Sequence, residues 1–332
     1  MRKWTKTSEF YVAIIILVLF VAIGSQNGAF FSSANMFDLI RSSIVPGIFV
    51  ICTMMVIISG GIDVSFPAIA TFSMFSATKI ILMLDLDLPV FVAFLLAGII
   101  GLGLGLINGL LIAYFKLPTL IVTLGTSSMF SGFLLTFVGS RQISNLPPAL
   151  EQFGKTPFIK FTTDAGITVG LPMSVLITAA VIVIVAIMMK YTMIGRGIYA
   201  LGGDPVSAER IGFNTKFLQC FVYGFVGFLA GIAGMIQTTM MRSSNPVDLL
   251  GTELLIIAAV VLGGVRITGG HGTVIGALLG LLLIVTIQNS LILVGIPSYW
   301  QRFVIGALIL VGTGVAAYQI KRSSSKRSSI LT

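Results

Sequence analysis

Charged residues are scarce in this chain. Only 9% of its 332 residues are Asp, Glu, Lys or Arg, whereas an ordinary soluble domain carries about a quarter. The chain is 56% hydrophobic, and its mean hydropathy is +1.07. So few charges cannot cover a soluble protein of this size, so the apolar surface must face lipid. The composition therefore predicts an all-α protein that crosses a membrane several times.

The residues that usually carry catalysis or bind metals are also rare. His271 is the only histidine, and the two cysteines, Cys52 and Cys220, both lie in apolar runs. These counts exclude a histidine-pair metal site and a disulfide framework. The sequence has no G-x-S-x-G nucleophile motif and no G-x-x-x-x-G-K run that would hold ATP phosphates. We expect no enzyme activity, and neither a metal nor a cofactor bound by this chain.

Long apolar stretches alternate with polar, proline-rich or glycine-rich segments along the whole chain. A transmembrane helix needs about 20 apolar residues, and the sequence predicts about ten such spans. They are 10–30, 44–60, 66–84, 89–115, 120–138, 171–189, 217–238, 253–263, 273–294 and 302–320. Residues 1–332 are then one transmembrane domain.

The distribution of charge predicts the orientation of these spans. With a cytoplasmic amino terminus, thirteen of the twenty basic residues and four of the eleven acidic residues fall on the inner face. The inner face then carries +9 and the outer face carries zero, as the positive-inside rule requires. We expect the protein in the inner membrane with both termini in the cytoplasm. Residues 321–332 are then a basic cytoplasmic tail. The pI near 9.8 does not indicate a nucleic-acid partner, because the orientation of the chain in the lipid bilayer accounts for its positive charge.

Two connections between spans are long enough to have a function. Residues 139–170 are expected outside and residues 190–216 inside. The inner one contains Asp204, a good N-cap, and Pro205, a good first helical residue. We expect a short helix over 206–211 that ends at Gly212, lying on the cytoplasmic face as a docking element.

Two Gly/Leu-rich segments resemble each other. Residues 101–125 and 276–306 each contain glycines, then an Asn, then a Pro before a new span. They lie on the fourth and the ninth predicted span, so a genuine repeat would be inverted across the membrane. Inverted repeats commonly build alternating access about a site at mid-membrane. Chance similarity between Gly/Leu-rich spans is the other explanation.

Few polar residues are candidates for a solute pathway or gate. Asp63 lies with Gly61 and Ser65 in a glycine turn before the third span, where either polar residue could instead cap that helix. Uncharged polar residues in or near spans include Asn108, Gln288, Asn289 and Gln301. They suit a hydroxyl-rich solute, although hydrogen bonds between helices explain such residues equally well. A second glycine turn, 262–272, is expected to allow close packing.

Four motifs, in order along the chain, resemble one family. They are 60–65 (Gly-Gly-Ile-Asp-Val-Ser), 123–126 (Thr-Leu-Gly-Thr), 203–213 and the Gly-Gly loop 262–272. Over roughly 45–320 the chain resembles the sugar-type permeases of binding-protein-dependent ABC importers, which include ribose, xylose, galactose and autoinducer-2 permeases. One departure is Phe66-Pro67, where relatives usually carry Val-Gly.

The resemblance implies a division of labour. Two permease chains, identical or homologous, would form the pathway for a small polar solute such as a monosaccharide. Separate ABC ATPase subunits would use ATP and magnesium, and an extracytoplasmic solute-binding protein would deliver the cargo. The segment 190–216 would be the coupling loop. The residues implied to contact the ATPase are Asp204, Pro205, Ala208, Glu209, Arg210 and Gly212.

Two other classes of protein remain as alternatives. An ion-coupled secondary transporter would work without an ATPase, but such carriers keep ionisable residues at membrane depth, and the predicted spans hold almost none. A membrane-embedded enzyme would need an acidic pair or a histidine within the spans. The predicted spans contain neither.

Overall fold

The protein is described by a computed structural model that covers residues 8–85, 88–162 and 168–293, together with positions 295, 297, 300, 303, 306 and 307. The helices within these residues are α1 (Ser8–Gln26), η2 (Gly28–Phe31), α2 (Ser33–Ile58), α3 (Phe66–Met83), α4 (Val90–Phe115), α5 (Thr119–Phe133), η3 (Leu134–Val138), α6 (Pro148–Lys155), α7 (Ser174–Tyr191), α8 (Met193–Gly203), α9 (Pro205–Arg210), α10 (Thr215–Met241), α11 (Glu253–Leu262) and α12 (Val274–Leu293). Most of the predicted span 302–320 and all of the predicted tail 321–332 lie outside the described residues.

Seven of the described helices are long and apolar enough to cross a membrane: α1, α2, α3, α4, α5 with its π-helical extension η3, α7 and α10. The shorter apolar helices are Glu253–Leu262 and Val274–Ser290. Each of the first nine predicted spans overlaps one of these helices, and the chain is a polytopic membrane protein. The main difference in bounds is α2, which begins at Ser33 and continues through Pro46, well before the predicted start at 44. Its first turns carry the charged residues Asp38 and Arg41, which lower the local hydropathy, so the apolar pattern did not include these turns.

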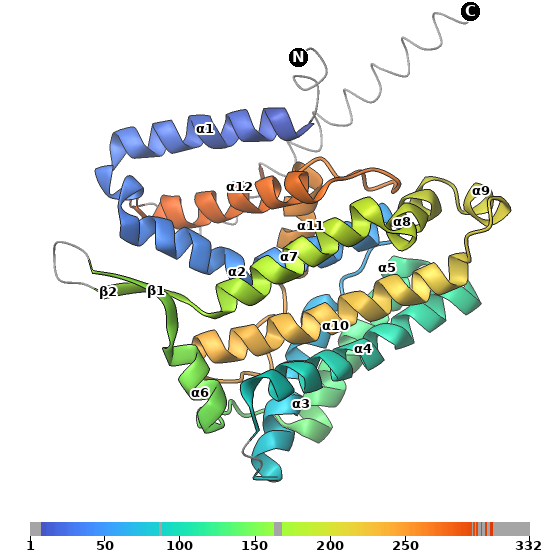
Figure 1. Ribbon diagram of the computed structural model, residues 1–332, viewed down its shortest axis with the longest axis horizontal. Helices are drawn as coiled ribbons and strands as arrows, with labels where there is room; N and C mark the ends of the chain where they lie inside the picture. Colours follow the sequence, from blue (N-terminus) through green and yellow to red (C-terminus); the bar gives the residue numbers. More distant parts are fainter. Residues whose placement is uncertain are drawn as a thin grey trace, which may run out of the picture.

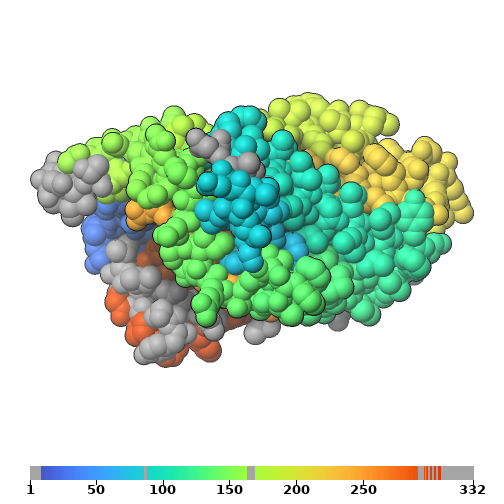
Figure 2. All heavy atoms as spheres, turned by 90° about the horizontal axis from the view of Figure 1, so that it is seen from below, coloured from blue at the N-terminus to red at the C-terminus, as the bar shows by residue number. Residues whose placement is uncertain are grey.

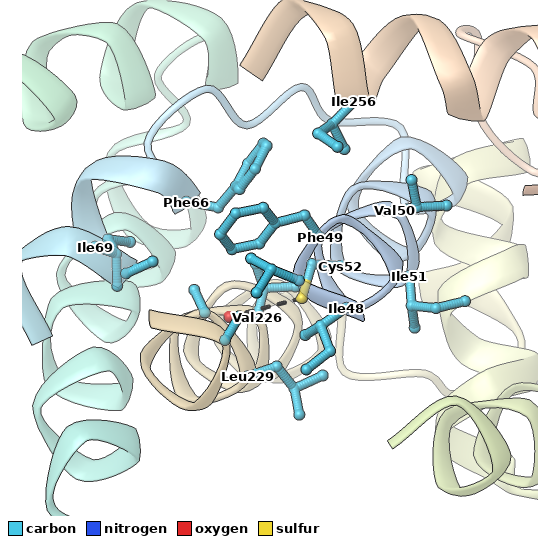
Figure 3. Close-up of a cluster of buried hydrophobic side chains, with 14 of the residues drawn as sticks. Ile48, Phe49, Val50, Ile51, Cys52, Phe66, Ile69, Val226, Leu229 and Ile256 are labelled. Carbon is cyan, nitrogen blue, oxygen red and sulfur yellow. Dashed lines mark hydrogen bonds between the residues drawn. The ribbon is translucent and has the colours of Figure 1, made fainter. Parts of the chain in front are cut away.

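The core is built around α2, whose second half is almost completely buried. Phe49 packs on Phe66 at the start of α3, with ring centroids 4.9 Å apart. Cys52 contacts the carbonyl oxygen of Val226 on α10 at 3.9 Å, and Figure 3 shows these side chains converging between α2, α3 and α10. The thiol of Cys52 therefore acts as a small core group, in agreement with its position in an apolar run.

Helices α4 and α10 lie side by side along much of their length (Figure 1). A Cβ atom at Gly101 or Gly105 of α4 would overlap a backbone oxygen of α10, and a Cβ at Gly231 of α10 would overlap one of α4. Small residues at helix interfaces in membranes let backbones approach and gain van der Waals contact. Gly101 and Gly105 of the 101–125 segment thus have a packing role.

The segment 139–170, predicted as an outer connection, contains secondary structure that the sequence pattern did not indicate. Pro148 begins α6, and Leu150 is buried beneath it. Strands β1 (Pro157–Thr162) and β2 (Thr168–Pro172) form an antiparallel hairpin in which Ile159 pairs with Leu171. The expectation of an all-α chain is therefore corrected by this one two-stranded sheet. Both strands are short, and β1 is largely exposed, so they give no alternation of buried and exposed residues that would predict a strand.

Helices α8 and α9 lie at one end of the molecule, and α6 and the hairpin lie at the other (Figure 1). The space-filling view repeats this, with the yellow α9 region at one edge and the green hairpin and α6 toward the other (Figure 2). The two long connections thus lie at opposite ends of the helix bundle. This is the arrangement expected if they face opposite sides of a membrane.

Candidate coupling surface and solute pathway

The connection between α7 and α10 is formed by two helices in succession. Thr192 caps α8 by accepting a hydrogen bond from the Gly195 N–H at 3.1 Å. Asp204 follows α8 directly and caps α9. The sequence predicted the second of these helices but not the first, because α8 is rich in glycine and lacks a long apolar run.

Asp204 holds the start of α9 by three hydrogen bonds. Its carboxylate accepts from the N–H groups of Val206 and Ser207, at 3.2 and 3.1 Å, and from the Ser207 hydroxyl. The Ser207 hydroxyl, followed by its backbone N–H, lowers the pKa of Asp204 below its usual value. The predicted N-cap is confirmed, and Pro205 occupies the first helical position.

The remaining residues of the predicted coupling set divide by exposure. Glu209 and Arg210 are exposed, as is Pro205, whereas Ala208 is buried against the protein. Gly212 adopts φ +95 and ends the helix, and nothing lies within 4 Å of where its Cβ would be. Helix α9 thus presents a small, mixed-charge surface and is anchored by Ala208 beneath it.

The end of α8 is packed against two other turns at a junction of glycine backbones. A Cβ at Gly202 would overlap the carbonyl oxygen of Ile58, at the end of α2. A Cβ at Gly269 would lie 2.6 Å from Gly202 O and 2.9 Å from Gly60 Cα. The Gly270 N–H donates to Ile58 O at 2.9 Å. We call Gly60, Gly202, Gly269 and Gly270 the glycine junction.

A side chain reinforces this junction. The Tyr199 hydroxyl, on α8, donates to the carbonyl oxygen of Gly272 at 2.8 Å. The loop 263–272 is therefore joined to α8 by both Tyr199 and the glycine contacts. The expectation that the second glycine turn permits close packing is confirmed.

Asp63 lies directly after the junction, in the connection between α2 and α3, and it is 1% exposed. Its Oδ1 atom accepts from the Ser65 N–H at 2.7 Å and from the Ser65 hydroxyl at 2.6 Å. That hydroxyl accepts from the Asn108 amide at 2.8 Å. Of the two residues expected as alternative caps of α3, Asp63 accepts a hydrogen bond from the backbone N–H at its start, whereas Ser65 makes no side-chain cap bond. The Ser65 hydroxyl instead links α4 to Asp63.

Asp63 is buried without a cationic partner among the described residues. Its Oδ2 atom and the Oδ1 atom of Asn108 are both buried with no hydrogen-bond partner in the described part of the chain. Burial of an unpaired carboxylate is costly, and the neutral acid is favoured in such surroundings. The cluster therefore has unused hydrogen-bonding capacity at its centre.

Two threonines of α5 hold the backbone around Asp63. Thr119 accepts from the Ile62 N–H at 3.0 Å, and Thr123 accepts from the Val64 N–H at 3.3 Å. Two of the sequence motifs, 60–65 and 123–126, are thus hydrogen-bonded to each other. We call Asp63, Ser65, Asn108, Thr119 and Thr123 the inner polar cluster.

Gly61 has a steric role beside this cluster. A Cβ at Gly61 would overlap the hydroxyl of Tyr223, which reaches in from α10 and is 2% exposed. Four of the six predicted pathway residues, Gly61, Asp63, Ser65 and Asn108, therefore lie together. Sequence reasoning missed Tyr223 because an aromatic residue in an apolar helix is ordinarily core.

The other two predicted pathway residues lie elsewhere. Gln288 and Asn289 are half-buried on α12. The Asn289 amide donates to the hydroxyl of Ser42, on the first half of α2, at 3.4 Å. The six residues are therefore in two places, and no local sequence signal separates them.

Comparisons with known proteins identify the family of this chain. Residues 35–312 match the model of the family described as branched-chain amino acid transport system / permease component. The ribose import permease protein RbsC of Haemophilus influenzae is 32% identical over 91% of this chain and 90% of its own length. The ribose import permease protein RbsC of Bacillus subtilis is 34% identical over 91% and 89%. The autoinducer 2 import system permease protein LsrC of Salmonella choleraesuis is 29% identical over 93% and 86%. No solved structure matches the chain.

The family match covers most of the chain, including the inner polar cluster, α8, α9 and the glycine junction. The matches cover 90% and 89% of the length of the two ribose permeases. The chain is a transport subunit and not an enzyme. It belongs to the branched-chain amino acid transport system / permease component family, whose relatives at this level of identity include import permeases for ribose and autoinducer 2.

Proposed function

We propose that this chain is the permease subunit of an ATP-driven ABC importer that carries a monosaccharide across the inner membrane by alternating access. The observation that carries the proposal is the capped helix α9, displayed at one end of the bundle and connected through α8 and the glycine junction to the buried Asp63 connection. A chain with no ATP-binding motif needs a surface at which an ATPase subunit can bind and drive its conformational change. The relatives named for ribose support a sugar as cargo.

The proposed topology has ten spans, with both termini in the cytoplasm. The predicted charge difference of +9 across the membrane supports this orientation, with α9 inside and the β1–β2 hairpin outside. An inverted relation between 101–125 and 276–306 stays a prediction within this scheme. The proposed partners are two ABC ATPase subunits, a second permease chain, membrane lipid and an extracytoplasmic solute-binding protein.

Coupling would proceed from the ATPase to the pathway through contacts already described. Asp204, Pro205, Glu209, Arg210 and Gly212 would meet the ATPase, while the buried Ala208 fixes α9 to the permease. ATP and magnesium would be bound by the ATPase only. Movement of α9 would pass through Gly202 to the α2–α3 connection, because backbones in direct contact cannot move independently.

The inner polar cluster is proposed as the gate at the cytoplasmic end of the pathway. Gly61, Asp63, Ser65 and Asn108 come from the connection before α3 and from α4, so a shift of one helix against the other would break the Asn108–Ser65 hydrogen bond. Gln288 and Asn289 are proposed to lie along the outer part of the pathway. A two-state element of this kind is what alternating access requires.

The proposal is tested by uptake in proteoliposomes that contain the permease with its ATPase and binding protein. We expect uptake of radiolabelled D-ribose that needs ATP and persists when proton and sodium gradients are collapsed. Uptake driven by an ion gradient in the absence of the ATPase would instead establish a secondary transporter. Uptake of L-leucine but not D-ribose would retain the importer and replace the sugar by an amino acid, as the family description would then suggest.

A further inference from the structure

A cavity of about 330 Å³ lies between the first half of α2, the end of α10 and the start of α11. None of the residues predicted for the pathway lines it. Ser42, which does line it, is the residue to which Asn289 donates its hydrogen bond. The cavity therefore adjoins the second group of predicted pathway residues, away from the coupling helix.

Polar groups of several kinds line this cavity. Arg41 and Ser42 come from α2, Gln237 from α10, and Asp248 and Thr252 from the connection before α11. The Gln237 amide donates to Asp248 Oδ2 at 2.6 Å, which fixes both side chains. Arg41 makes no ion pair with any carboxylate among the described residues. The lining thus offers hydrogen-bond donors and acceptors, together with one positive and one negative side chain.

The apolar part of the lining includes Phe49, which is 1% exposed. Phe49 packs on Phe66, and Ile256 lies beside the two rings (Figure 3). Phe66 immediately follows Ser65 of the inner polar cluster. The Phe49–Phe66 pair therefore connects the cavity lining to the residue that follows the inner polar cluster in the chain.

We propose that this cavity is the outward-facing binding subsite for a neutral, polyhydroxylated solute of monosaccharide size, and that the Phe49–Phe66 pair is its floor. The inference rests on the proposed function, because it concerns the cargo of the same pathway. It adds residues that recognise the cargo and a barrier that must open between the cavity and the inner polar cluster.

Size and chemistry both favour this class of solute. Small-molecule sites commonly measure ~300–1,000 Å³ and combine apolar walls with a few fixed polar groups. A sugar presents hydroxyls that donate and accept on its edges, and C–H groups on its faces. Asp248 and the Gln237 carbonyl accept hydrogen bonds, Arg41 donates them, and Ser42 does both. The Thr252 hydroxyl donates to the Leu249 carbonyl oxygen at 2.8 Å and so offers an acceptor. The opposite charges of Arg41 and Asp248 leave no excess of one sign to attract an ion.

Thiol labelling tests whether the cavity opens outward. The experiment uses the complete importer, in which Cys220→Ser removes the partly exposed native cysteine and Thr252→Cys places a reporter cysteine in the cavity. Whole cells are treated with a membrane-impermeant methanethiosulfonate reagent. Cys52 is 0% exposed and is kept. We expect labelling that D-ribose slows and L-leucine does not. The matched control is Val247→Cys, on the same connection but outside the cavity and 47% exposed, which is expected to react at one rate with or without solute.

Transport measurements test the polar groups. Gln237→Leu and Asp248→Asn each remove hydrogen-bonding capacity, and we expect D-ribose uptake at limiting concentration to fall by roughly tenfold. Ser43→Ala is the control, because its hydroxyl is bonded to the Leu39 carbonyl and it lines a different cavity. ATPase activity stimulated by the binding protein is expected to persist in both variants, which separates a lost solute contact from a misfolded complex.

The possible failures are distinguishable. Normal D-ribose uptake by both variants, or labelling of Thr252→Cys that D-ribose leaves unchanged, would overturn the subsite while the proposed function stands. Protection by L-leucine alone would overturn the polyol assignment. A wild-type importer that takes up no D-ribose under ATP would contradict the proposed sugar cargo itself, and the subsite as a sugar site with it.

Discussion

The side-chain amide of Asn108 donates to the hydroxyl of Ser65 at 2.8 Å across 43 positions of the chain, and that hydroxyl in turn donates to Asp63 at 2.6 Å. One hydroxyl therefore connects a transmembrane helix to a buried carboxyl group. Hydrogen bonds in such a chain polarise one another, and loss of the middle member affects both neighbours.

Ser65→Ala tests this relationship. It removes the only described partner of the Asn108 amide and one of those of Asp63, so we expect the free energy of unfolding to fall by about 1–3 kcal/mol. Thermal unfolding of the purified protein in detergent measures the change. Ser73→Ala is the control, because the Ser73 hydroxyl is equally buried and has no partner among the described residues. Equal melting temperatures for the two variants would refute the structural role of Ser65.

Adjacent glycines at the end of α8 give a matched pair for the coupling route. Gly202→Ala places a methyl group against the Ile58 carbonyl oxygen, whereas Gly203→Ala places one in open space. We expect the first to reduce transport per ATP hydrolysed and the second to leave that ratio unchanged.

Tyr199→Phe is a milder companion to the Gly202 variant, because it removes one hydrogen bond to Gly272 and adds no bulk. We expect ATP hydrolysis to continue while solute uptake falls, in the same direction as for Gly202→Ala. Simultaneous measurement of ATPase rate and uptake in proteoliposomes gives the ratio. Full coupling in both Tyr199→Phe and Gly202→Ala would show that the junction does not transmit movement.

The cap of α9 predicts a specific pH dependence. Hydrogen bonds from Ser207 lower the pKa of Asp204 in the folded protein, so its stabilising effect is fully present above the unfolded value of 3.8 and is lost as the pH falls through the lower folded pKa. Between pH 5 and 8, well above that pKa, Asp204 stays ionised. Titration of Asp204 should therefore not change binding of the ATPase subunit in this range.

Substitutions at Asp204 separate the cap from its charge. Asp204→Asn retains a capping oxygen, whereas Asp204→Ala removes it. We expect weaker binding of the ATPase subunit for the alanine variant and near-normal binding for the asparagine variant, measured by co-purification or calorimetry. If Asn binds as weakly as Ala, the ATPase reads the charge of Asp204 and not the position of α9.

Gly212 allows a test of the surface just beyond α9. Its φ of +95 favours glycine and is tolerated by asparagine more readily than by other residues. Gly212→Asn is expected to keep coupling, whereas Gly212→Trp adds a large ring at an exposed position where the ATPase is proposed to dock. We expect the tryptophan variant to hydrolyse ATP with little uptake; normal uptake would remove Gly212 from the coupling surface.

Features that depend on neighbouring residues were predictable from the sequence. Continuous apolar runs located nine of the helices, because the bilayer requires about 20 apolar residues whatever the fold. Asp204, Pro205 and Gly212 marked α9, because each residue stabilises a helix end through contacts within a few positions. Short elements such as β1 and β2 left no pattern, since few of their residues are buried.

The sequence by itself determined that this is a polytopic membrane protein, that a capped helix lies between α7 and α10, and which family it belongs to. Only the tertiary structure decided that Gly60, Gly202 and Gly269 meet at one junction, that Asn108 reaches Ser65, and that Gln288 and Asn289 lie apart from Asp63. The physical reason is range: caps and hydropathy act within a turn or a span, whereas these contacts join residues separated by tens to hundreds of positions. The packing of whole helices determines which residues come into contact. A backbone contact between glycines involves no side chain, so no sequence pattern predicts it.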